Sequence, residues 1–274
     1  MTISLSAIHI YPVKALGGIS LDSSLVTARG LKNDRRFLVV DAQDKFLTQR
    51  NYPKMATVWV EISYGTRGDE VVFSAPDAGS VAFPAVPEAS QVRNVQVWSS
   101  TVSAQAVSAE ADRWLSDYLG AEVRLVYMPD SSKRQVNPRY ARENDVVSFA
   151  DGYPLLVISE ASLSDLNARI VADGGRALPM NRFRPNLVIA GCDAHAEDRL
   201  GEIAIGDALF RAVKPCARCQ VTTTDQAAGE VRGPEPLRTL AAYRDSADGP
   251  LFGMNLIPVR AGAVRTGDAV RLAT

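Results

Sequence analysis

The chain has 274 residues, of which 46% are hydrophobic and 22% are charged. This length and composition are typical of a soluble globular protein with one large domain or two ordinary ones. Lysine and arginine number 30 against 31 acidic residues, a formal net charge of -1. This balance argues against a nucleic-acid-binding protein, because such proteins usually carry a basic excess.

The amino-terminal segment and the cysteine content indicate the setting in which the chain works. Residues 1–18 lack a basic start, a long apolar core and a small-residue cleavage site, so we expect no secretory signal. No window approaches the roughly 20 apolar residues that a membrane-spanning helix requires. Three cysteines do not make a disulfide framework. We therefore expect a cytoplasmic protein whose cysteines are thiols or metal ligands.

The first hundred residues are predicted to form mostly strands. Residues 36–50 and 57–75 each place two apolar runs around a polar turn, which predicts hairpins. Residues 94–107 alternate apolar and polar side chains in the manner of a strand. Short strands with regular turn signals favour a small barrel or sandwich in this part of the chain.

A helix followed by a strand is predicted at the end of this first part. Residues 108–120 carry four large apolar side chains on one helical face, and Gly120 suits the position just after a helix end. Residues 121–129 then return to a strand pattern. We therefore expect the first domain to comprise residues 1–125 and the second to comprise residues 126–274.

The segment 130–145, just past this division, is polar and contains a proline. Four of its side chains are cationic: Lys133, Arg134, Arg139 and Arg142. The segment is interpreted either as a solvated loop or as a basic flap over an anionic ligand.

The second part mixes strands and helices. Residues 153–170 predict a buried strand that runs into a helix, with Ser159 or Ser162 as its N-cap. The remaining predicted elements are a strand within 184–191, a hairpin over 203–213, a short helix over 235–244 and strands over 255–274. Together, these elements predict a β-rich α+β protein in two parts.

The cysteine pair Cys216 and Cys219 leaves several kinds of site open. A structural zinc site needs four ligands, and Cys192 with His195 offers a second pair at the same spacing. A thioredoxin-like redox couple is disfavoured, because the β-branched run after Cys219 predicts a strand where that motif needs a helix. Two buried inert cysteines fit the same spacing, as does a single thiolate that binds another transition metal.

Arg218 lies between the two cysteines in sequence and is relevant to the single thiolate. A cation beside Cys219 favours its thiolate form and lowers the pKa of the thiol. Spacing alone does not decide between these kinds of site.

Eight ordered segments resemble one known family over nearly the whole chain. The segments "YPVKALGG", "GLKNDRRFLVVD" and "FLTQR" resemble the β-barrel domain that precedes a MOSC domain, the molybdenum cofactor sulfurase C-terminal domain. The segments "FADGYPLLVISEASLSDLNARI", "MNRFRPNLVIAGCDAHAED", "KPCARCQVTTTD", "EPLRTLAAYR" and "PLFGMNLIPV" resemble the MOSC domain itself. The likeness is to amidoxime-reducing components and their bacterial relatives, and it implies an N-terminal β-barrel-like domain followed by a MOSC-type mixed β-barrel with peripheral helices.

The resemblance implies a molybdenum cofactor, molybdenum on a molybdopterin dithiolene, in a cleft between the two domains. It assigns the metal to Cys219, the second cysteine of its block, and leaves Cys216 without a metal. The residues that it assigns to cofactor binding are Lys14, Arg35, Asp151, Gly152, Tyr153, Arg184, Asn186, Ala217 and Arg218. Arginines suit the pterin phosphate because the guanidinium presents paired donors.

The resemblance also implies an activity, the reduction of N-hydroxylated compounds such as amidoximes, hydroxylamines and N-hydroxylated bases. The electrons are expected from a separate ferredoxin, flavoprotein reductase or cytochrome, because no cysteine follows Cys219 to hold an iron–sulfur cluster. Asp225 and the acidic residues of "DAHAED" are candidate proton donors. A carrier of the cofactor or of sulfur, without turnover, is the alternative function.

Overall fold

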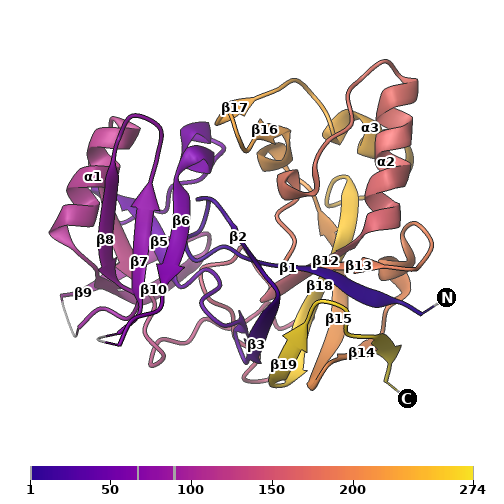
Figure 1. The fold of residues 1–274 in the computed structure, drawn as a ribbon, viewed down its shortest axis with the longest axis horizontal. Helices are drawn as coiled ribbons and strands as arrows, with labels where there is room; N and C mark the ends of the chain where they lie inside the picture. Colours follow the sequence, from indigo (N-terminus) through magenta and orange to yellow (C-terminus); the bar gives the residue numbers. More distant parts are fainter. Residues whose placement is uncertain (1, 67, 89–90, 274) are drawn as a thin grey trace.

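The computed structural model describes residues 2–66, 68–88 and 91–273. Its largest sheet has eight strands and belongs mainly to the second half of the chain (Figure 1). The spatial order is β2 (Ile19–Leu21), β1 (Ser4–Ile10), β13 (Leu187–Ala190), β12 (Leu155–Ser159), β18 (Leu251–Arg260), β15 (Ala208–Ala217), β14 (Glu202–Ile205) and β20 (Val270–Leu272). The adjoining three-stranded sheet is β19 (Gly262–Arg265), β3 (Ser23–Thr27) and β4 (Gly30–Leu31).

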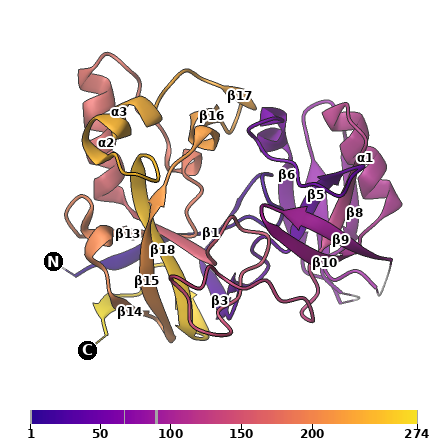
Figure 2. The same cartoon turned by 180° about the vertical axis from the view of Figure 1, so that it is seen from behind.

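The first half of the chain builds two smaller sheets beside the large one (Figures 1 and 2). One contains β5 (Phe37–Asp41), β11 (Val123–Tyr127), β10 (Ser100–Ala106) and β9 (Val92–Val97). The other contains β6 (Trp59–Ser63), β7 (Glu70–Ser74) and β8 (Ser80–Pro84). Alternating side chains of β5, β11 and the second of these sheets share one hydrophobic core with helix α1 (Ala109–Leu119), which buries Leu115 and Tyr118 in it. Strands β9 and β10 contribute to a neighbouring core.

The α-helices lie where local sequence signals predict them. Ser108 caps α1 by accepting hydrogen bonds from the backbone N–H groups of Glu110 and Ala111, and Gly120 follows in the left-handed conformation. Helix α2 (Glu160–Ala172) directly follows β12, with Ser159 as its N-cap. The other helices are α3 (Leu237–Arg244) and the 3₁₀ turns η1 (Pro53–Thr57), η2 (Met180–Arg182), η3 (Ala196–Arg199) and η4 (Gln220–Thr223).

The β-rich α+β class predicted from the sequence is confirmed, as are the hairpin β6–β7 and the hairpin β14–β15. The strand predicted directly after Cys219 is wrong, because η4 occupies residues 220–223. Thr222 donates both its N–H and its hydroxyl to the carbonyl of Cys219, a local bonding pattern that competes with strand formation. A short pair, β16 (Thr224–Asp225) and β17 (Glu230–Val231), follows.

The sheet pairing crosses the division predicted at residue 125. Strand β1 lies between β2 and β13, and β3 pairs with β19 near the other end of the chain. The first 31 residues are therefore part of the sheets that the second half completes. The two-domain division itself stays a prediction. None of the helices in the described parts of the chain is both long and apolar enough to cross a membrane.

Candidate functional site

A cavity of about 310 Å³ is lined by residues from both halves of the chain. All ten residues that the sequence assigns to the site line this cavity: Lys14, Arg35, Asp151, Gly152, Tyr153, Arg184, Asn186, Ala217, Arg218 and Cys219. Lys14 and Arg35 come from loops that follow β1 and β4. The other eight precede β12 and β13 or lie at the carboxyl end of β15 and just beyond it. The fold thus brings together side chains that are far apart in sequence.

The charged side chains that line the cavity are mostly cationic. Six of the lining residues are basic: Lys14, Arg35, Arg50, Arg184, Lys214 and Arg218. Among the described lining residues, Asp151 is the one carboxylate. This excess of positive charge favours an anionic ligand, since the field of several cations adds in a partly enclosed space.

Two of these arginines lie over the same buried tyrosine ring. The guanidinium groups of Arg35 and Arg184 are 4.3 Å and 4.2 Å from the ring centroid of Tyr11. Arg35 also donates to the buried Asp34 at 2.7 Å and to the side-chain oxygen of Asn186 at 3.0 Å. The Tyr11 hydroxyl donates to the carbonyl of Pro185 at 3.2 Å. The site therefore has a rigid cationic wall, and the role of Tyr11 in it was not predicted from the sequence.

The guanidinium of Arg184 is only partly satisfied by protein acceptors. Its backbone is left-handed, with φ of 54°, and its Nη1 donates weakly to Gln226 at 3.3 Å. Its Nη2 is buried and has no hydrogen-bond partner among the described residues. Burial lowers the pKa of Arg184 to about 10, so the side chain is still a cation at neutral pH. An orphaned buried donor of this kind indicates a missing acceptor, because burying an unpaired polar group is costly.

Lys14 and Asp151 form an ion pair within the cavity. The Lys14 side chain is 8% exposed, whereas that of Asp151 is 73% exposed. Desolvation raises the pKa of the Asp151 carboxyl, but the charge and hydrogen bond of Lys14 outweigh it and hold that pKa well below its usual range. Asp151 is therefore ionised at neutral pH and is a poor proton donor.

Arg134 stabilises the loop that carries Asp151 through hydrogen bonds to its backbone. This arginine is buried and donates to three carbonyl oxygens, those of Ser148, Ala150 and Asp151. The basic-flap interpretation of segment 130–145 is therefore wrong for Arg134, which supports the cavity loop from inside. Lys133, Arg139 and Arg142 do not line the cavity.

The cysteine pair lies along one edge of the cavity, and both thiols are free and half-buried. The guanidinium of Arg218 donates to the sulfur of Cys216 at 3.1 Å and to the carbonyl of Phe183 at 2.7 Å. The guanidinium of Arg218 thus turns toward Cys216, and its expected effect on the Cys219 thiol stays a prediction. The Cys219 sulfur remains available to a ligand in the cavity.

The remaining assigned residues have different local roles. Asn186 is buried, accepts from the N–H of Leu156 at 3.2 Å and donates to the carbonyl of His9 at 3.2 Å, so it also joins β1 to β12 and β13. A Cβ added to Gly152 would meet no protein atom within 4 Å, so nothing in the protein itself requires glycine there. Tyr153 packs edge-on against Tyr140, with ring centroids 6.2 Å apart.

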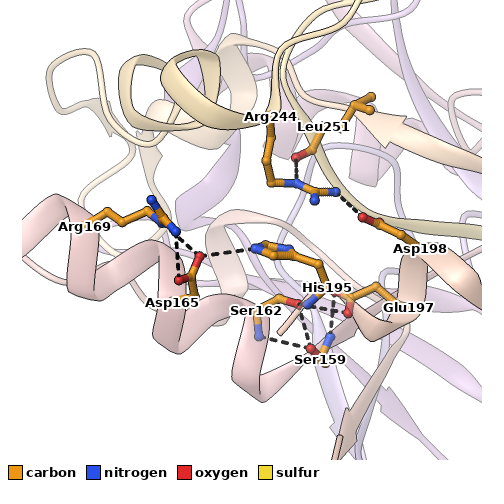
Figure 3. A network of polar contacts seen from close by, with 9 residues as sticks. All are labelled: Ser159, Ser162, Asp165, Arg169, His195, Glu197, Asp198, Arg244 and Leu251. Atoms are coloured by element: carbon orange, nitrogen blue, oxygen red, sulfur yellow. Dashed lines mark hydrogen bonds and ion pairs between the residues drawn. The ribbon is translucent and has the colours of Figure 1, made fainter. Parts of the chain in front are cut away.

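The zinc arrangement considered from the sequence is not formed. Across residues 2–66, 68–88 and 91–273, no three histidine, cysteine or acidic side chains gather into a metal-binding group. His195 instead contacts Asp165 at 3.2 Å, in a polar network around α2 and η3 (Figure 3). Cys192 packs against the core of the large sheet. Cys192 and His195, the second pair of candidate zinc ligands, thus make other contacts.

The candidate proton donors from the sequence also lie outside the cavity. Glu197 is fully buried and accepts from the N–H of Ser159 and the hydroxyl of Ser162, while Asp198 accepts from Arg244 (Figure 3). Asp225 accepts from the backbone N–H groups of the following turn and from Arg182. These carboxylates bind other groups of the protein and do not line the cavity, so they are not positioned as its proton donors.

Several lining residues were not singled out from the sequence, among them Gln49, Arg50 and Trp98. Gln49 forms a reciprocal amide pair with Gln226, with bonds of 2.9 Å and 3.2 Å that join the two halves of the chain. The block "FLTQR", which carries the family resemblance, was the available signal for Gln49 and Arg50. Trp98 offered no signal beyond its place in an alternating strand pattern.

Comparison with known proteins identifies the family of the chain. The family described as "MOSC N-terminal beta barrel domain" matches residues 2–122, and the family described as "MOSC domain" matches residues 144–271. Mitochondrial amidoxime reducing component 2 of Macaca fascicularis is 32% identical over 97% of this chain and 82% of its own length. Mitochondrial amidoxime-reducing component 1 of Mus musculus is 33% identical over 98% and 82%.

A further relative has a different name. Molybdenum cofactor sulfurase of Oryza sativa subsp. japonica is 32% identical over 93% of this chain, which spans 32% of that longer protein. The two matched domains and the near full-length relatives agree with one another. The chain therefore belongs to the MOSC family of proteins with an N-terminal MOSC β-barrel domain, which includes the mitochondrial amidoxime-reducing components.

Proposed function

We propose that this protein is a molybdenum-cofactor-dependent reductase of N-hydroxylated compounds. The observation that carries the proposal is a single cavity lined by six cations, a free Cys219 thiol and all the residues assigned from the family resemblance. The names of the relatives supply the substrate class, since amidoximes carry an N–OH group.

The residues present fit an anionic pterin cofactor. Arg184 presents an unpaired buried Nη2 and Arg218 an unpaired buried Nε, so two buried donors among the described lining residues lack an acceptor. Arg35 is fixed by Asp34 and Tyr11 before any ligand binds, which reduces the entropy that binding would cost. We propose that Lys14, Arg35 and Arg184 bind the pterin phosphate and that the sulfur of Cys219 binds the metal.

The cofactor, when bound, supplies the two-electron chemistry that breaks an N–O bond. The reduction of an N–OH group to N–H consumes two electrons and two protons and releases the oxygen as water. Cys219 would donate electron density to the metal and thereby help to set its potential. The cationic wall would hold the cofactor in one orientation, and the apolar side chains of Leu155, Leu156 and Phe183 would limit water in the depth of the cavity.

The proton source is not an acidic residue of the cavity. Asp151 is held ionised by Lys14, and it is the one carboxylate among the described lining residues. We infer that protons reach the substrate from solvent through the open mouth of the cavity. The three cysteines of the sequence are fewer than the four that bind an iron–sulfur cluster. A separate ferredoxin, flavoprotein reductase or cytochrome would therefore deliver the electrons.

The molybdenum and pterin content of the purified protein tests the cofactor assignment. Cys219→Ala should lose most of its molybdenum while its circular dichroism and melting temperature stay close to the wild-type values. Cys192→Ala, outside the cavity, is the matched control, and Cys216→Ala tests which thiol of the pair binds the metal. Both should retain molybdenum. Equal molybdenum in Cys219→Ala and wild type, or zinc without pterin in the wild type, would refute the assignment.

The activity itself is tested with the molybdenum-loaded protein and an artificial electron donor. Conversion of an amidoxime to the amidine should depend on Cys219 and should be absent with NADH alone. The rice relative named molybdenum cofactor sulfurase favours a second candidate, a carrier of cofactor or sulfur. Rapid exchange of the bound cofactor, together with no reduction under any donor, would support the carrier and contradict the reductase.

A further inference from the structure

Three exposed side chains make up the rim of the cavity, and one of them, Trp98, contacts the other two. Arg50, Trp98 and Asp151 are the exposed members of the described lining, whereas the others are buried or half-buried. The indole N–H of Trp98 donates to the Asp151 carboxylate at 3.1 Å. The guanidinium of Arg50 lies 4.9 Å from the centroid of the Trp98 ring. Any molecule that enters from solvent therefore meets this rim first.

Trp98 is held in a conformation that a bulky residue seldom adopts. It lies in the turn between β9 and β10 with φ of 54°, in the left-handed region. Gln96 donates to its carbonyl at 2.6 Å, and Phe46 packs edge-on against its ring with centroids 4.9 Å apart. Backbone strain of this kind persists only where the surroundings fix it, and it is concentrated at ligand-binding sites.

Trp98 lines the same cavity as Cys219, the proposed metal ligand, and is therefore a candidate to contact the substrate. Cys219 lines the cavity from the second half of the chain, just beyond β15, and Trp98 lines it from the first half. Trp98 is 41% exposed, so part of its ring is free of protein contacts. A substrate whose N–OH group points toward Cys219 would extend the rest of its body toward this rim.

We propose that Trp98 is a specificity-determining residue that favours N-hydroxylated substrates with a flat aromatic body. This inference rests on the proposed reductase function. Aromatic rings stacked on an indole gain attraction beyond the burial of their area, whereas small aliphatic groups gain little. Trp98 would bind the body of the substrate in the ground state and the transition state alike. Its loss should therefore raise KM and leave kcat nearly unchanged.

The test compares two variants of Trp98 on two substrates. Trp98→Phe keeps an aromatic ring and removes the N–H that binds Asp151, whereas Trp98→Leu keeps apolar contact with Phe46 and removes the ring. The substrates are benzamidoxime, which has an aromatic body, and acetamidoxime, which has a methyl group. Trp59→Leu is the matched control, because Trp59 is 56% exposed and lies outside the cavity lining.

We expect Trp98→Leu to raise KM for benzamidoxime about tenfold, or about 1.4 kcal/mol, and to change KM for acetamidoxime less than twofold. Trp98→Phe should stay within threefold of wild type on both substrates, and Trp59→Leu should match wild type. Equal effects of Trp98→Leu on both substrates, or none on either, would overturn the proposal while the reductase function stands. Reduction of neither substrate by the wild-type protein would instead refute the proposed function.

Discussion

Replacing Arg134 by methionine should loosen the cavity loop and lower the stability of the protein. The guanidinium donates to the carbonyls of Ser148, Ala150 and Asp151, and Ser148 is fully buried. Each hydrogen bond from a charged donor contributes roughly 1.5–3 kcal/mol. In the variant, water can reach the carbonyls of Ala150 and Asp151. The variant also lacks the free-energy cost of burying the guanidinium charge. We therefore expect a net loss of about 3 kcal/mol.

The loss is measured by thermal and urea denaturation of the two proteins. For a chain of this size, about 3 kcal/mol lowers the melting temperature by roughly 6–12 °C. Arg139→Met is the matched control, because Arg139 is exposed, belongs to the same segment and stacks on Tyr140 without lining the cavity. Arg134→Met should also retain less pterin than Arg139→Met. Equal melting temperatures and equal pterin contents for both variants would refute a supporting role for Arg134.

Three further predictions concern residues outside the cavity. Glu197→Ala should cost about 3 kcal/mol in urea denaturation, because it leaves the buried donors of Ser159 and Ser162 unpaired; an unchanged midpoint would contradict this. The N–H groups of the turn after Asp225 hold the pKa of its carboxyl below the usual value. The ionised carboxylate therefore stabilises the folded protein above about pH 4, and this stabilisation is lost as the pH falls through the lowered pKa. Asp225→Asn should therefore flatten the loss of stability between pH 5 and 3, measured by urea denaturation, and leave the pH profile of reduction between pH 6 and 8 unchanged. Ser108→Ala should destabilise α1 by about 1 kcal/mol, seen as a lower urea midpoint with unaltered turnover.

Local sequence signals predicted the elements that depend on local physics. Helix α1 follows from its apolar face and its terminal glycine, and the hairpin β6–β7 follows from alternation and turn residues. The partners of each strand could not be predicted in this way, because a strand pattern does not encode its neighbour. The position of β1 between β2 and β13 therefore came only from the structure.

The candidate site could be named from the sequence only through the family resemblance. The Lys14–Asp151 pair joins residues that are 137 positions apart, and no spacing rule links them. The unpredicted Tyr11 acts through its buried ring, which looks like any core aromatic in sequence. Trp98 was missed because it lies with Ser99 in the two-residue turn between β9 and β10, and such a turn has no reliable signature when it lacks glycine and asparagine.

The place of β1 in the large sheet has a consequence for synthesis on the ribosome. Ser4 pairs with Ala190, so this strand emerges long before its neighbour β13 has been translated. At about 5–20 residues per second, the wait lasts roughly ten to forty seconds. During that interval the nascent β1 exposes Leu5, Ile8 and Ile10, which the finished protein buries. Chaperones that bind apolar nascent segments should therefore engage this chain at its first strand and be released once β13 arrives.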